Sequence, residues 1–152
     1  MKNSGVYIAV ISILVLFCTL ESSAQRGMKW RGSGGWGMGS NYNRLYDTKT
    51  IETIRGEVIK VDKMTPKKGM TYGVHLMLKT GKEIVSIHLG PAWYLENLDT
   101  KIEPKDEVEV TGSRIMFEGK PAIIAAELRK GDEVLKLRDE NGFPFWGGWR
   151  RR

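Results

Sequence analysis

The sequence has one cysteine, Cys18, and two histidines among its 152 residues. Cys18 lies in the apolar amino-terminal segment, so the remainder of the chain offers no thiol nucleophile and forms no disulfide. The Gly-x-Ser-x-Gly elbow of hydrolases is also absent, as is a glycine-rich phosphate loop before a helix. These absences predict a protein that is not an enzyme, binds no cofactor, and depends on packing for its stability.

The first 24 residues have the pattern of an export signal. Lys2 precedes an apolar run from Val6 to Leu20 that contains no charged residue. This run fits a signal core of about 7 to 15 residues, whereas a membrane-spanning helix needs about 20. We therefore expect cleavage near Ala24-Gln25 and a periplasmic or secreted mature chain without a transmembrane segment. Two alternatives stay open, which are retention of the segment as an anchor and a lipoprotein modified at Cys18.

The rest of the chain divides into three parts by composition. Residues 25–47 and 143–152 are rich in glycine, aromatic residues and arginine, and residues 48–142 form one domain-sized segment. The chain has a net charge of +6, which comes entirely from the two tails because the basic and acidic residues of 48–142 are equal in number. The central domain therefore presents no net attraction to a polyanion, whereas the tails do.

The tryptophans of the tails allow two interpretations. Their rings can fold back over the central domain, where glycine permits close approach, because exposed tryptophan is costly. Alternatively, arginine and tryptophan together stack on bases or sugars and neutralise phosphate, as in proteins that bind single strands. For the second interpretation the candidate polyanion-binding residues are Lys67, Lys68, Trp146, Trp149, Arg150, Arg151 and Arg152.

The central segment is dominated by β patterns. Apolar residues alternate with polar ones over most of its length, and glycine, proline and asparagine separate the runs. The pattern predicts strands over 50–62, 72–79, 83–89, 107–115 and 121–128, a short sixth pairing over 134–137, and one helix over 91–98. Gly56 and Gly112 fall inside strands, where a missing side chain permits a bulge or a sharp bend.

Three strands, a helix and two further strands are the order of a five-stranded Greek-key barrel of the OB type. The predicted fold class is therefore all-β, with the short helix between the third and fourth strands closing one end and flexible Gly/Trp-rich tails outside. In such barrels the outer face of the second and third strands is the usual ligand surface.

Residues 50–138 resemble the small exported bacterial OB-fold proteins. The run 72–76, Tyr-Gly-Val-His-Leu, and the run 88–94, His-Leu-Gly-Pro-Ala-Trp-Tyr, are similar to a group often labelled DNA-binding. A more distant similarity links the chain to periplasmic copper-binding OB-fold proteins, which use histidine, methionine and tryptophan as ligands. The resemblance implies a fold and a compartment; it brings no catalytic motif.

The second and third strands carry the candidate ligand-binding residues His75, Met77, Ser86 and His88. With a turn at Thr80-Gly81, position 75 lies opposite Ser86 and diagonal to His88, so these side chains share one face of the hairpin. Imidazole and thioether groups suit cuprous or silver ions, for which His75, Met77 and His88 are the candidate ligands. A partly exposed strand face without a ligand explains the same residues.

The sequence thus predicts a non-enzymatic binding or accessory module. Its leading function is recognition of an anionic polymer, either nucleic acid or an envelope polyanion, or of a partner protein in the envelope. The alternative is soft-metal binding through the histidines, and a third possibility is a purely structural interaction protein. The ligand, the oligomeric state and the partner are not specified by the sequence.

Overall fold

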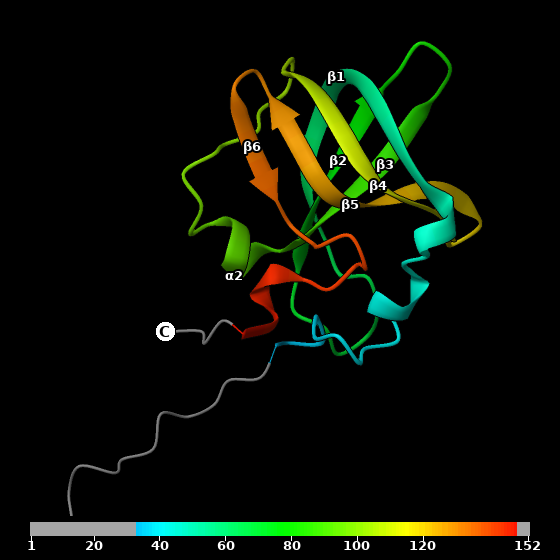
Figure 1. Ribbon diagram of the computed structural model, residues 1–152, viewed down its shortest axis with the longest axis vertical. Coiled ribbons are helices and arrows are strands. Elements are labelled where there is room, and N and C mark those ends of the chain that lie inside the picture. The colour runs from blue at the N-terminus through cyan, green and yellow to red at the C-terminus, as the bar shows by residue number, and fades with distance from the viewer. Residues whose placement is uncertain (1–32, 149–152) are drawn as a thin grey trace, which may run out of the picture. The chain divides into compact units, whose positions relative to one another are not determined.

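The computed structural model describes residues 33–148, which belong to one compact unit. Figure 1 shows a curled sheet with short helical turns beneath it. The strands are β1 (Ile51–Met64), β2 (Gly73–Lys79), β3 (Ile84–Pro91), β4 (Glu107–Phe117), β5 (Lys120–Lys130) and β6 (Glu133–Lys136). The helical turns are η2 (Asn43–Leu45), η3 (Thr48–Thr50), α2 (Ala92–Leu95) and η4 (Phe145–Gly148). In this part of the chain, no helix combines the length and hydrophobicity needed to cross a bilayer.

Strands β1 to β5 form a closed barrel. The hydrogen-bonded order is β3-β2-β1-β4-β5-β6, and a parallel pairing of β3 with β5 closes the sheet. This order, with α2 between β3 and β4, confirms the predicted five-stranded OB-type Greek key. Strand β6 lies outside the barrel and extends the second half of β5.

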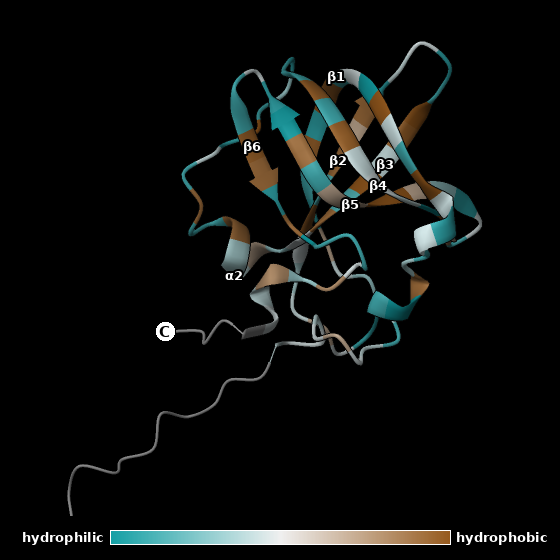
Figure 2. Cartoon of the chain, viewed as in Figure 1, coloured by the Kyte–Doolittle hydropathy of each residue, from teal (hydrophilic) through white to brown (hydrophobic). Residues whose placement is uncertain are grey.

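The barrel closes around the apolar face predicted from the alternation in its strands. Leu76 and Leu78 of β2 pair with Ile87 and Val85 of β3, and all four side chains are buried. Most of their neighbours along each strand are less hydrophobic, with Ile84 as an exception, and teal and brown bands alternate along the strands in Figure 2. Apolar burial on the inner face therefore fixes which side of each strand faces inward.

Two glycines allow neighbouring strands to approach closely where the sheet curls. A Cβ atom at Gly112 would overlap the carbonyl oxygen of Ile124, and one at Gly56 would overlap the carbonyl oxygen of Lys79. A bulge lies beside Gly112, as predicted, but the irregularity in β1 falls between Val58 and Lys60 rather than at Gly56. Gly56 is thus required for strand contact, and the bend comes slightly later.

The described parts of both tails fold back against the barrel. Trp36 and Trp146 are each 1% exposed, and the indole Nε1 of Trp146 donates a hydrogen bond of 2.9 Å to the carbonyl oxygen of Trp36. The fold-back interpretation is therefore confirmed for these two tryptophans, whose segments meet beneath the barrel in Figure 1. The predicted signal segment 1–24, Trp30 and residues 149–152 lie outside the described residues.

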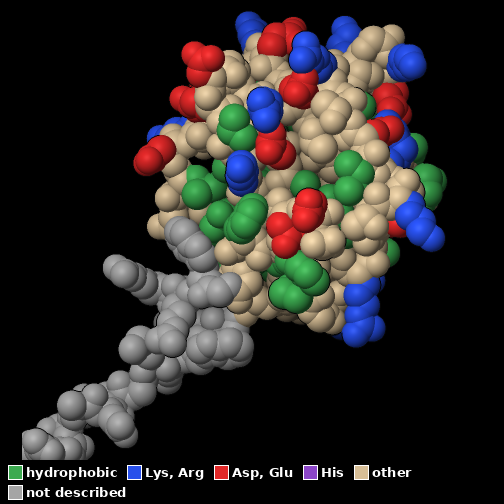
Figure 3. Space-filling model, viewed as in Figure 1, with side chains coloured by type: hydrophobic (Ala, Val, Ile, Leu, Met, Phe, Trp, Pro, Cys, Tyr) green, Lys and Arg blue, Asp and Glu red, His purple; other side chains and the backbone are tan. Residues whose placement is uncertain are grey.

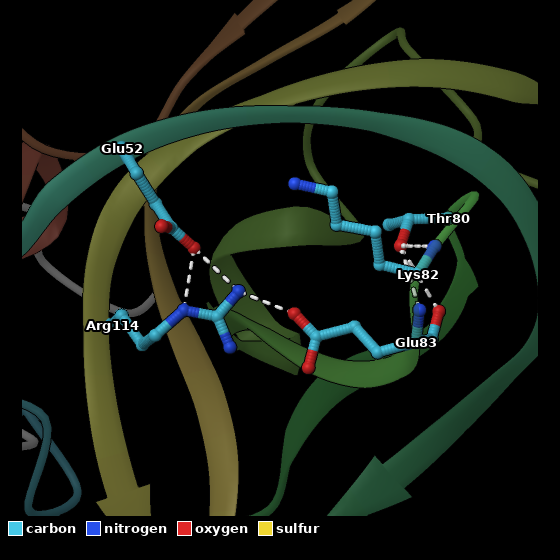
Figure 4. Close-up of polar contacts among 5 residues, drawn as sticks. All are labelled: Glu52, Thr80, Lys82, Glu83 and Arg114. Carbon is cyan, nitrogen blue, oxygen red and sulfur yellow. Dashed lines mark hydrogen bonds and ion pairs between the residues drawn. The ribbon is translucent and has the colours of Figure 1, made fainter.

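The opposite end of the barrel is joined by ion pairs. The guanidinium of Arg114 in β4 donates from Nε to Glu52 of β1 at 2.6 Å and from Nη2 to Glu83, just before β3, at 2.5 Å. Figure 4 shows Arg114 reaching across the space between these two carboxylates. One side chain thus links β1, β4 and the turn before β3, which are distant in sequence.

Candidate functional site on the outer face of the hairpin

The hairpin of β2 and β3 has a different register from the predicted one. His75 pairs directly with His88, and Met77 pairs with Ser86. The prediction that His75 lies opposite Ser86 was wrong because the turn contains four residues, 80–83, rather than two. Thr80 closes this turn, since its amide and its hydroxyl both donate to the carbonyl oxygen of Glu83.

The new register brings the two histidines closer together than predicted. Their ring centroids are 6.3 Å apart, and both side chains project from the outer face of the sheet. The Nδ1 atom of His75 lies 3.0 Å from the Ser86 hydroxyl, so Ser86 still contacts His75 along the diagonal. The predicted grouping of these residues on one face is therefore correct.

His88 is not part of an open surface. Its side chain is 1% exposed because the Tyr42 ring stacks on it at 6.0 Å and the Phe117 ring meets it edge-on at 4.9 Å. Tyr42 comes from the amino-terminal segment, and Phe117 comes from the end of β4. The expectation that His88 faces a ligand directly was wrong, since this chain's own aromatic residues occupy that position. His75, Met77 and Ser86 stay half-buried.

The buried guanidinium of Arg138 lies behind this face. Arg138 is 4% exposed, and its Nη1 donates to the carbonyl oxygens of Ala125 at 2.5 Å and Leu89 at 3.3 Å. The Trp146 ring lies 4.7 Å from the guanidinium carbon, so a cation–π contact supports the charge. Trp146 was a candidate polyanion-binding residue, and that prediction was wrong because its ring is sealed between Arg138 and Trp36.

Burial and positive charge lower the pKa of both imidazoles. Desolvation lowers the pKa of His88 to about 3, and the nearby charges of His75 and Arg138 act in the same direction. Burial also lowers the pKa of His75, against an opposing effect from Asp62. Arg138 itself has a pKa lowered to about 10 by desolvation, so it remains charged at neutral pH.

The segment 58–79 is basic, and its lysines are exposed. Residues 58–79 contain five lysines and one aspartate, although the central domain as a whole is neutral. Lys63, Lys67 and Lys68 are exposed, and the Lys63 ammonium lies 4.5 Å above the ring of Tyr72, which is 44% exposed. We call these four residues the basic edge. The basic edge concentrates positive charge in one part of a domain whose net charge is zero.

The described residues hold no group of three or more histidine, cysteine, aspartate or glutamate side chains arranged for a metal ion. The predicted soft-metal ligands consist of the two imidazoles of His75 and His88 and the thioether of Met77, all on the same face of the hairpin. Their Nδ1 atoms are taken by Ser86 and Tyr42. This leaves the two Nε2 atoms as the possible metal ligands.

The fold and this face define a small OB-type β-barrel module in which the chain's own aromatic residues partly cover the outer face of the hairpin. Residues 50–135 match the model of the MamS/MamX magnetosome protein family, and the chain belongs to that family. No curated protein sequence matches the chain significantly.

Proposed function

We propose that this protein is a non-enzymatic, magnetosome-associated binding module that recognises an anionic polymer through its basic edge. The family name supports the association with magnetosomes. The observation that carries the ligand class is the exposed Tyr72 ring beneath the Lys63 ammonium, at the end of the connection between β1 and β2 that also contains the exposed Lys67 and Lys68. An aromatic face flanked by lysines suits a polymer with phosphate or sulfate groups, because it offers both stacking and charge neutralisation.

The basic edge replaces the outer hairpin face as the contact surface. His88 and Trp146 are buried, so neither reaches a ligand. The arginines at positions 150–152 add three positive charges in the sequence and extend the same chemistry. We further propose export to the periplasm, in line with the resemblance to small exported OB-fold proteins, and regard their DNA-binding label as one case of polyanion recognition.

Salt dependence of binding tests this proposal. The full chain is titrated against a fluorescent single-stranded oligonucleotide and against dextran sulfate over a series of salt concentrations. The double variant K67A/K68A should lower the slope of log affinity against log salt for the oligonucleotide by about 0.7 for each phosphate that is no longer neutralised. A matched control is K120A/K136A, which removes two exposed lysines of β5 and β6. Equal slopes for the two variants would show that the basic edge is not the surface that binds the polyanion.

A second candidate function is soft-metal binding. It is favoured by one observation, the pair of imidazoles with ring centroids 6.3 Å apart and Nδ1 atoms within hydrogen-bond distance of hydroxyl groups. The positive charge of Arg138 behind His88 opposes a cation there, which places this candidate second. Titration of cuprous ion into the protein and into His75→Ala tests this second function. Micromolar binding that is lost in the variant supports a metal site. Absence of binding to both proteins excludes a metal site.

A further inference from the structure

An apolar pocket opens at the end of the barrel beside α2. Its volume is about 450 Å³, and its walls come from strands β1, β2, β3 and β6, from the last residue of α2 and from the segment after α2. The apolar lining consists of Val61, Val74, Leu89, Leu95, Leu98, Ile102 and Leu135. A pocket of this size with mostly aliphatic walls is typical of ligand-binding sites.

The pocket exists because the helix is too short to close the barrel. Helix α2 contains four residues and is therefore about 6 Å long, little more than the spacing of about 4.8 Å between two neighbouring strands. Tyr94 of α2 is buried and packs against Trp146, so the helix covers only that part of the barrel end. Leu89, a core residue that is 2% exposed, lies at the bottom of the pocket.

The rim of the pocket is acidic. Glu96 and Glu103 line it together with one lysine, Lys101, and all three are exposed. Of the six acidic residues in segment 96–109, Asp106 pairs with Lys130 and Glu109 pairs with Arg55, whereas no ion pair is made by Glu96 or Glu103 among the described residues. In Figure 3, hydrophobic side chains near β6 and α2 have both basic and acidic side chains beside them. An apolar anion such as a fatty acid is therefore disfavoured at this opening.

We propose that this pocket binds a peptide segment of a partner protein in which a large apolar side chain is flanked by lysine or arginine. The apolar side chain enters between Leu89, Leu95 and Ile102, and the flanking cations meet Glu96 and Glu103. This interaction differs from polyanion recognition in the charge that it uses, because Glu96 and Glu103 lie on the segment after α2, whereas the basic edge adjoins the opposite wall of the pocket at Val61 and Val74. The module then has two surfaces of opposite charge and joins a polyanion to a basic protein segment.

Fluorescence polarisation with a labelled peptide tests the proposal on the full chain. The probe is a pentapeptide with a central tryptophan and two arginines on each side. Two comparison peptides replace the tryptophan by alanine or the arginines by glutamates. We expect each comparison peptide to bind at least tenfold more weakly than the probe, since one lacks the apolar side chain and the other the matching charge.

Variants locate the binding in the pocket. The charge-reversed E96K/E103K should weaken binding of the probe at least tenfold, while the control E118K/E140K, which changes two exposed glutamates outside the lining, should not. K67A/K68A should leave peptide binding unchanged, which separates this inference from the proposed polyanion function. Equal weakening by both glutamate pairs, or equal binding of the alanine peptide, would show nonspecific charge attraction and overturn the proposal.

Discussion

The hydroxyl group of Tyr42 lies 2.8 Å from Nδ1 of His88, and both side chains are buried. This hydrogen bond joins the segment before the barrel to strand β3, 46 positions away in the sequence. It satisfies two polar atoms that would otherwise be desolvated without compensation. The amino-terminal segment is thus held to the barrel by a specific polar contact as well as by apolar packing.

Tyr42→Phe should destabilise the protein by about 1–3 kcal/mol, because it keeps the ring but leaves His88 Nδ1 buried without a partner. The free energy of unfolding in urea at neutral pH measures the change. Tyr72→Phe is the control, since Tyr72 is 44% exposed. If the two variants were destabilised equally, the hydrogen bond would contribute nothing specific.

The buried His88 should make stability depend on pH in the mildly acidic range. Its pKa is about 3 in the folded protein and about 6.5 in the unfolded chain, so below pH 6.5 the unfolded chain binds an extra proton. Stability is therefore greatest above about pH 6.5 and falls with decreasing pH, by up to about 1.4 kcal/mol per unit, until about pH 3.

His88→Gln removes this titration. Urea unfolding between about pH 5 and 6.5 should give a shallower decrease in stability for the variant than for the wild type, because one proton fewer is taken up on unfolding. The pKa of His75 is lowered as well, so His75 also makes stability fall with decreasing pH, in the wild type and in the variant alike. Identical slopes would mean that His88 is protonated in the folded state.

The barrel could be predicted from the sequence because each strand is recognisable from the alternation of its own residues. Alternation in β2 and β3 identifies the inward residues regardless of which partner each one meets. The pairing itself depends on turn length, and Thr80 specifies a four-residue turn through hydrogen bonds that alternation does not reveal. A change of two residues in register preserves every inward side chain but replaces Ser86 by His88 opposite His75.

The covering of the site could not be predicted in the same way. Trp36 and Tyr42 lie in a glycine-rich segment without periodicity, so the sequence offers no direction for their rings. Arg138 follows β6 and has the pattern of an exposed strand end, yet tertiary contacts with Ala125 and Trp146 bury it. The one useful signal was the general cost of exposed tryptophan, which correctly favoured fold-back.

Gly90→Ala should destabilise the fold by about 1–3 kcal/mol through overpacking. Gly90 has a φ of 156°, and an added Cβ would lie 2.7 Å from Cη2 of the buried Trp146 ring. Thermal unfolding followed by tryptophan fluorescence reports both the decrease in stability and any displacement of that ring. Gly81→Ala is the control because no heavy atom lies within 4 Å of its added Cβ. A neutral Gly90 variant would show that Trp146 is not fixed against β3.

Arg114→Ala should lower stability by about 1 kcal/mol, since the side chain is only 31% exposed and bonds two carboxylates at once. The hydrogen bond from Arg114 to Glu83 is the main cause of its raised pKa, with Glu52 acting in the same direction. The destabilisation should shrink as salt rises, because screening weakens the wild-type pairs. Arg55→Ala is a matched control, since Arg55 pairs with Glu109 but is 82% exposed and should change little. Equal effects of the two substitutions at every salt concentration would mean that the link between β1, β4 and the hairpin adds nothing beyond an ordinary surface pair.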